Sequence, residues 1–402
     1  MRKLFAKLHL WISIPFGLLI SIICLTGASL VFEPEITRAL DPQLYRVQKV
    51  GRQALPPSQL AARIRGQLPD TLHLTSLRLS GDPGESCLAG FRETGRQTLS
   101  IDPYTGEVLG RTKTPGFFRT MRQLHRWLMD APASKGSSSV GKRIVGISTL
   151  LLVVVLVSGL VIWVPRNRKA LKNRLKVSCT NGWRRFWHDT HVALGFYATL
   201  FLLVMALTGL TWSFGWYRTA AYGLFGGSAR QEASTAAAGA PQKSSGEAAA
   251  GRSGHNSGSP EHGMSEGRPD GKRDEKRTEE FDFRAWDALL RNLQAQYPVY
   301  KTITLGMTDA QIAANTHLRR VDTATFDPSS GEIREIARYR DAPRSQTLRG
   351  WFYAFHTGIW GGLTTRILYF LAALIGGSLP LTGYYLWWKR TRSRKKNPQS
   401  VR

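Results

Sequence analysis

Cysteine and acidic side chains are scarce in this chain of 402 residues. The three cysteines, Cys24, Cys87 and Cys179, lie far apart and form no CxxC motif, which excludes a disulfide framework and a thiolate metal site. No GxGxxG motif opens a helix after a strand, so we expect no domain that binds a nicotinamide or flavin nucleotide. Asp and Glu number 28 against 55 Lys and Arg, which gives a formal net charge of +27.

The excess of basic residues is concentrated at three places. Residues 1–7, 165–187 and 389–402 together hold 18 Lys and Arg and no acidic residue. The rest of the chain carries 37 basic and 28 acidic residues, so its charge is closer to balance. Because each basic segment flanks a long apolar stretch, the charge indicates membrane topology and argues against a nucleic-acid partner.

Four apolar stretches, each close to the roughly 20 residues that cross a bilayer, predict four transmembrane helices. We place them within residues 1–32, 142–165, 188–214 and 351–388, the last with an exterior extension. Under the positive-inside rule the N-terminus, the basic loop 166–187 and the basic tail 389–402 are cytoplasmic. The long segments 33–141 and 215–350 then lie outside. The sequence predicts a multi-pass protein of the lipid bilayer with both termini in the cytoplasm.

The two halves of the chain repeat the same motifs. His9 precedes Thr26-Gly27 by 17 residues, and His191 precedes Thr208-Gly209 by the same number. Ser158-Gly159 of the second span likewise corresponds to Thr382-Gly383 of the fourth. We therefore infer a tandem duplication in which each half is a helix, an exterior domain and a second helix.

The exterior segments repeat as well. An Asp-Pro turn ending in Gly-Glu occurs at 102–107, and a similar turn occurs at 327–332, each between apolar residues. Both predict a β-hairpin, and we expect two α+β domains, 33–141 and 215–350. Residues 226–280 are rich in Ala, Gly, Ser and mixed charge, which predicts a disordered insertion in the second domain.

Four of the nine histidines recur at equivalent positions in the two halves: His9, His125, His191 and His356. His9 and His191 begin spans that run outward, so both lie near the cytoplasm, whereas His125 and His356 precede spans that run inward from the exterior face. Two facing neutral imidazoles complete the axial ligation of a b-type haem, and we expect two such haems. The absence of a CxxCH motif excludes covalent haem attachment. For a single histidine, a ring packed beneath the headgroups is the simpler interpretation, but recurrence at equivalent positions favours a site.

Several residues near these histidines allow two interpretations. The repeated glycines Gly27, Gly159, Gly209 and Gly383 would let a flat macrocycle approach the backbone or would let helices pack closely. Nearby arginines would pair with haem propionates or reach to the lipid headgroups: Arg122, Arg126, Arg184 and Arg185.

Further candidates lie beside His191 and His356. His188 is three residues from His191 on the same helical face, but the 17-residue spacing favours His191 as the ligand. The aromatic residues near His356 form either a surface for substrate binding or an interfacial belt: Trp351, Tyr353 and Trp360.

The order of these motifs is that of a known family. The correspondence rests on Leu8-His9, Thr26-Gly27, the turn at 102–107, Leu124-His125-Arg126-Trp127, His191 with Gly195, Thr208-Gly209, His356-Thr357-Gly358, and Thr382-Gly383 through Trp388. The chain resembles the PepSY-associated transmembrane helix proteins, which include the FoxB-type inner-membrane ferrisiderophore reductases. It departs from their pattern at the 226–280 insertion and at Ser158, which stands in place of threonine.

The resemblance implies a function. It implies two periplasmic PepSY domains and four helices in the bacterial inner membrane, with two haems b held by histidines. It also implies an oxidoreductase that reduces ferric siderophores and releases ferrous iron. Because no nucleotide domain is expected, the electrons would come from a separate cytoplasmic reductase or from quinol.

Two other classes of function fit parts of the sequence. A membrane-anchored PepSY protein that binds or regulates a periplasmic peptidase would have no redox activity, and its histidines would be dispensable. A metal or siderophore transporter fits less well, because few polar residues lie in the middle of the spans.

Overall fold

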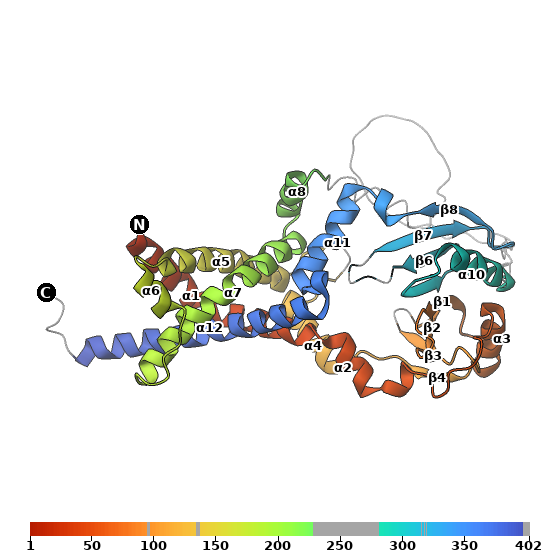
Figure 1. The fold of residues 1–402 in the computed structure, drawn as a ribbon, viewed down its shortest axis with the longest axis horizontal. Coiled ribbons are helices and arrows are strands. Elements are labelled where there is room, and N and C mark those ends of the chain that lie inside the picture. The colour runs from red at the N-terminus through yellow and green to blue at the C-terminus, as the bar shows by residue number, and fades with distance from the viewer. Residues whose placement is uncertain are drawn as a thin grey trace, which may run out of the picture.

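The computed structural model of this chain describes residues 1–94, 97–133, 137–227, 281–314, 316, 318 and 320–396. Most of the predicted insertion, residues 228–280, lies outside the described residues, as does the end of the predicted basic tail, residues 397–402. The described chain comprises a helical bundle and a sheet domain, with short helices between them (Figure 1).

Four long helices form the bundle: α1 (Arg2–Leu30), α5 (Val140–Trp163), α7 (Trp183–Ser213) and α12 (Gly362–Lys396). Each contains a stretch that is long and apolar enough to cross a membrane, as the sequence predicts. Helices α1 and α7 each pack against both α5 and α12, which closes the four helices into a bundle. Small and aliphatic side chains such as Ile20, Leu156 and Leu202 fill its centre.

The two long segments that follow α1 and α7 contribute one eight-stranded antiparallel sheet with the strand order β4-β3-β2-β1-β5-β6-β7-β8. Its strands are β1 (Leu74–Ser80), β2 (Cys87–Phe91), β3 (Thr98–Ile101), β4 (Val108–Arg111), β5 (Thr302–Leu305), β6 (Asp309–Ala313), β7 (Val321–Phe326) and β8 (Ile333–Ala337). The sequence suggests two separate domains, whereas here β1 pairs with β5, for example Leu77 with Leu305. This pairing covers the edge strand that each four-stranded half would otherwise expose.

Two helices and the apolar side of the sheet make the core of this domain. Helices α3 (Pro57–Gln67) and α10 (Arg284–Gln296) contribute buried residues such as Leu60 and Trp286. Alternate strand residues, including Leu77 and Ile303, face the same core. The indole of Trp286 donates to the carbonyl of Gly306 at 2.8 Å, so its polar atom is satisfied inside the core.

Both predicted hairpins are confirmed, as β3–β4 and β7–β8. The carboxylate of Asp102 accepts from the backbone N–H of Tyr104 at 2.7 Å, and Asp327 accepts from that of Ser329 at 2.9 Å. Gly331 closes the second turn with φ of +74°, and a Cβ there would lie 2.1 Å from the carbonyl oxygen of Ala285. Glycine is therefore required at this turn by both conformation and space.

Short helices connect the bundle to the sheet. Helix α4 (Gly116–Trp127) packs on α1 and α5, and α11 (Arg344–Thr357) packs on α7. The sequence places the end of α11 and the fourth span in one segment, 351–388, but Gly358 adopts φ of +75° and ends α11 before α12 begins. The remaining short elements are α2 (Glu33–Leu40), η1 (Pro42–Leu44), α6 (Arg168–Arg174), α8 (Gly215–Leu224), η2 (Tyr339–Asp341) and η3 (Ile359–Gly361).

Candidate functional site

The four repeated histidines meet in two pairs inside the helical part of the molecule. His9 of α1 faces His191 of α7 with ring centroids 6.4 Å apart and ring planes at 90°. His125 of α4 faces His356 of α11 with centroids 6.1 Å apart and planes at 48°. We call His9 and His191 the bundle pair, and His125 and His356 the connector pair. These are the pairs that the sequence predicts from depth in the membrane.

Hydrogen bonds fix which ring nitrogen carries the proton. Nδ1 of His125 lies 2.8 Å from the carbonyl oxygen of Ile23, and Nδ1 of His356 lies 2.9 Å from that of Met205. Nδ1 of His9 lies 3.1 Å from the carbonyl oxygen of Val155. Since a carbonyl only accepts, these Nδ1 atoms donate, and the Nε2 lone pair of each neutral ring is left for a ligand bond.

Each ring also lies against one of the repeated glycines. A Cβ built on Gly27 would stand 2.8 Å from Cε1 of His125, and one on Gly209 would stand 3.1 Å from Cε1 of His356. In the bundle pair, the corresponding distances are 3.2 Å from Gly159 to His9 and 3.7 Å from Gly383 to His191. The sequence suggests that these glycines admit a macrocycle or allow helix packing. The structure shows that Gly27, Gly159 and Gly209 make room for the histidine rings, whereas a Cβ on Gly383 would make only an ordinary contact.

Before three of these glycines, the preceding hydroxyl residue also contacts the histidine: Ser158, Thr208 and Thr382. The hydroxyl of Thr382 lies 2.8 Å from Nδ1 of His191, and that of Ser158 lies 3.2 Å from Nδ1 of His9. This role is not apparent from the sequence, although the repeated Ser/Thr-Gly dipeptides signal that the position matters. Histidine, hydroxyl and glycine thus form one module that occurs on several helix pairs.

A model of the PepSY-associated TM region matches residues 6–390. The chain belongs to this family. No curated protein shows significant similarity to it. The match spans the bundle, the connecting helices and the sheet domain, so all four histidines lie inside the family region.

Both histidine pairs of this PepSY-associated protein have the spacing that a shared metal atom requires. A metal–imidazole bond is about 2.0–2.1 Å long, and in a five-membered ring with bonds near 1.33 Å the nitrogen lies about 1.1 Å from the centroid. Two imidazoles on opposite sides of one metal therefore have centroids about 6.3 Å apart. The observed 6.4 and 6.1 Å agree with that value.

The donor set suits a porphyrin iron better than a bare metal ion. Among the described residues, no group of three or more His, Cys, Asp and Glu side chains could hold an ion. A haem iron takes only two ligands from the protein, because the macrocycle supplies the other four. Burial lowers the pKa of His125 and brings the pKa of His356 down to about 4, so both imidazoles are neutral at pH 7. The residues present therefore fit a haem b in each pair.

His188, the alternative to His191, has a different partner. Its Nδ1 lies 3.2 Å from a carboxylate oxygen of Asp189, and its side chain is 56% exposed. Asp189 is itself buried and accepts from Arg185 at 2.7 Å. These three residues form a polar cluster at the start of α7, while His191 supplies the ring that faces His9.

Two of the arginines considered as propionate partners pair with carboxylates of the chain. Nη2 of Arg122 in α4 donates to both carboxylate oxygens of Glu33 in α2. Arg185 pairs with Asp189, as described above, and Arg126 lies over the ring of Trp127 at 4.5 Å. Arg122 and Arg185 therefore make structural contacts within the protein, and Arg122 joins α4 to the start of α2.

The predicted substrate-binding aromatics lie on α11 and the turn that follows it. Trp351, Tyr353 and Trp360 are each about two-fifths exposed. Trp351 stacks on Phe355 and Phe355 contacts Trp360, with ring centroids 5.6 Å apart in both cases. These rings form an aromatic surface beside His356.

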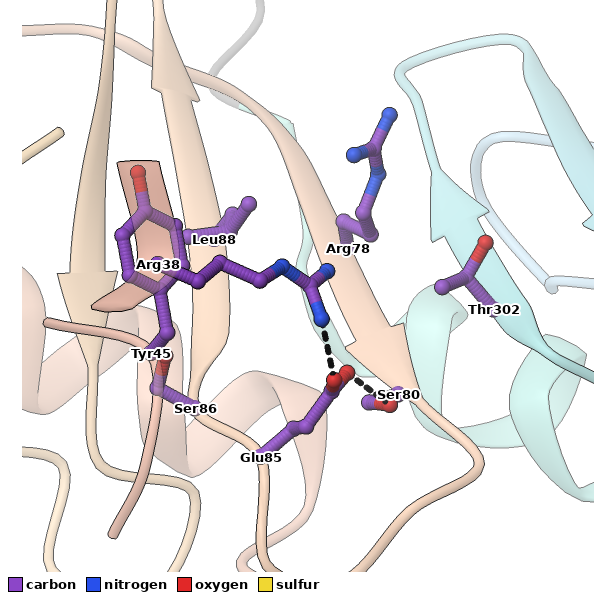
Figure 2. Close-up of a pocket in the computed structure, with 8 residues that line it drawn as sticks. All are labelled: Arg38, Tyr45, Arg78, Ser80, Glu85, Ser86, Leu88 and Thr302. Atoms are coloured by element: carbon purple, nitrogen blue, oxygen red, sulfur yellow. Dashed lines mark hydrogen bonds and ion pairs between the residues drawn. The ribbon is translucent and has the colours of Figure 1, made fainter. Parts of the chain in front are cut away.

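A small polar pocket of about 40 Å³ lies elsewhere, between α2 and strands β1, β2 and β5. Figure 2 shows Glu85 between Arg38 and Ser80, with the guanidinium of Arg78 directed away from it. The Arg38–Glu85 distance is 2.6 Å and the Ser80–Glu85 distance is 2.7 Å. This pocket joins α2 to the sheet and is lined by none of the four histidines.

Proposed function

We propose that the chain is a dihaem b-type electron-transfer protein of the bacterial inner membrane that reduces ferric siderophores on the periplasmic side. The observation that carries this proposal is the spacing of the two histidine pairs, 6.4 and 6.1 Å between centroids. A duplicated chain with cytoplasmic termini and a periplasmic sheet domain is part of the same proposal, supported by the repeated motifs and by the basic segments beside the helices.

The two histidine pairs would hold haems at two different places along the molecule. His9 and His191 would hold one haem near the cytoplasmic end of the bundle, where the N-terminus lies, away from the sheet (Figure 1). His125 and His356 would hold the other near the sheet domain. Each haem, when held by its two histidines, would supply a one-electron couple suited to electron transfer.

The substrate would dock beside the connector pair. Trp351, Tyr353 and Trp360 offer an exposed aromatic surface next to His356. Ferric iron is held by hard oxygen ligands, and the ferrous ion is held less tightly by the same ligands, so reduction would lead to release. The electron donor would be a separate cytoplasmic reductase or a membrane quinol.

An absorption spectrum of the detergent-purified protein, with and without dithionite, tests the proposal. We expect sharp b-type bands on reduction and about two haems per chain in a pyridine-haem assay. Replacing His9 or His356 singly by alanine should remove one haem each. His188→Ala is the matched control and should keep both, because His188 pairs with Asp189.

The same experiments also distinguish the proposed haem protein from its rival, a protein that binds a peptidase. A colourless protein whose four histidines tolerate alanine would refute the haem proposal and favour a peptidase-binding role. For the substrate, the dithionite-reduced protein should be reoxidised by a ferric hydroxamate in stopped-flow absorption. Failure to reoxidise with any ferric chelate, in a protein that holds two haems, would refute the reductase activity alone.

A further inference from the structure

The four Ser/Thr-Gly modules differ in how the hydroxyl meets the histidine. Thr382 Oγ1 is 2.8 Å from Nδ1 of His191, the shortest such contact. Ser158 and Thr208 lie farther from their histidines, at 3.2 and 3.3 Å. Thr26 instead donates to the backbone, at 2.6 Å to Ile22 and 3.1 Å to Ile23. Nδ1 of the corresponding histidine, His125, bonds directly to the Ile23 carbonyl.

The second hydrogen-bond partner of Thr382 shows which atom donates in the bond between Thr382 and His191. The Thr382 hydroxyl also lies 2.8 Å from the carbonyl oxygen of Leu379, which can only accept. A hydroxyl has a single proton, so Thr382 donates to Leu379 and accepts from Nδ1 of His191. Thr382 is 6% exposed, so water does not readily replace this contact.

We propose that Thr382 is the positioning residue of the bundle pair, and that its hydroxyl sets the basicity of His191 and thereby the reduction potential of the haem held there. The inference rests on the function proposed above. A hydrogen bond accepted from Nδ1 orients the ring and makes Nε2 a stronger donor, which favours ferric over ferrous iron. At His9, His125 and His356 the closest partner of Nδ1 is a backbone carbonyl, so among the four histidines only His191 has a side-chain hydroxyl as its closest hydrogen-bond partner.

The test is a redox titration of Thr382→Val in a His125→Ala background, so that the bundle haem is the only one present. Loss of one hydrogen bond should change the ratio of oxidised to reduced haem at a fixed potential roughly threefold to tenfold. At 59 mV per tenfold for one electron, the potential should rise by about 28–59 mV. Thr382→Ser keeps the hydroxyl and should restore the original potential.

Thr26→Val in a His9→Ala background is the matched control. The same substitution in the same motif removes a hydroxyl that bonds to the backbone, so we expect no rise in the potential of the connector haem. If Thr382→Val loses its haem while Thr382→Ser and Thr26→Val keep theirs, the positioning role is supported directly.

Other results would overturn the inference. These are a potential that is unchanged or lowered in Thr382→Val, or a rise of the same size in the Thr26 control. Such results differ from a failure of the proposed function itself, in which the parent protein would hold no haem to titrate.

Discussion

If the two proposed haems are bound, replacing Gly27 by alanine should displace the one at the connector pair and leave the one at the bundle pair in place. A Cβ on residue 27 would lie 2.8 Å from Cε1 of His125, whereas ordinary van der Waals contact begins at 3.4 Å. The ring would have to retreat by about 0.6 Å, while metal–ligand distances tolerate only about 0.2 Å. The ring is also held by the 2.8 Å bond from its Nδ1 to Ile23, so it cannot move without losing that bond.

The expected loss of haem affinity in Gly27→Ala follows from the overpacking at residue 27. Forcing one extra methyl into a packed site costs about 1–3 kcal/mol, which corresponds to a roughly 5- to 140-fold loss of haem affinity at 1.4 kcal/mol per tenfold. Gly383→Ala is the matched control, because its Cβ would lie at an ordinary 3.7 Å from His191. Alanine is also the better helix former by about 1 kcal/mol, so this variant should fold and keep both haems.

The assay is the pyridine-haem content of the purified variants, with the reduced absorption spectrum as a second readout. We expect about one haem for Gly27→Ala and two for Gly383→Ala, with intermediate losses for Gly159→Ala and Gly209→Ala, whose distances to the rings are 3.2 and 3.1 Å. Two haems in Gly27→Ala, or equal losses in the Gly27 and Gly383 variants, would refute the reasoning.

Three further predictions concern the ligand geometry and the sheet domain. The ring planes meet at 90° in the bundle pair and 48° in the connector pair, so electron paramagnetic resonance of the oxidised protein should show two distinct low-spin signals; a single signal would contradict this. Gly331→Ala should destabilise the sheet domain by about 1–3 kcal/mol, measured by thermal unfolding against Gly116→Ala, which meets nothing within 4 Å. Hydrogen bonds from Ser329 hold the pKa of Asp327 well below its usual 3.8. Its contribution to stability is therefore present above that value and lost at lower pH, so the difference in melting temperature between the parent and Asp327→Asn should shrink from pH 7 to pH 3.

The sequence predicts the bundle and the histidine pairs well because both depend on patterns within single segments. Four apolar stretches of membrane length require four helices, and a repeated spacing of 17 residues places His9 and His191 at one depth. The hairpins are predictable for the same reason, since the Asp-Pro turn and its glycine act locally.

Features that depend on contacts between segments are not predictable in this way. The pairing of β1 with β5 joins strands more than 200 residues apart, and neither strand carries a signal for the other. The close fit of Gly27 against His125 likewise depends on where α4 meets α1. The break at Gly358 is a local feature, yet the apolar residues on both sides hide it within one hydrophobic stretch.

The helices α1 and α7 each link the two sites, which constrains how the sites can move. Helix α1 supplies His9 to the bundle pair and Gly27 to the wall of the connector pair, and α7 does the same with His191 and Gly209. The 17 residues from His9 to Thr26 span roughly 25 Å of helix, so the separation of the sites is set by helix length and not by loops.

Helix α1 contains a proline, Pro15, between its two ends, and contacts from α12 hold this part of the helix in place. Pro15 cannot donate to the helix ladder, and nearby the hydroxyl of Tyr384 accepts from the N–H of Leu18 at 3.1 Å and donates to the carbonyl of Ile14 at 2.8 Å. The α12 side chain thereby bonds to two backbone groups of α1 near Pro15 and fixes α1 against α12. Because Tyr384 follows Gly383, the contact that anchors α1 lies beside the one that receives His191. The helix interface that positions the bundle pair therefore also fixes its distance from the connector pair.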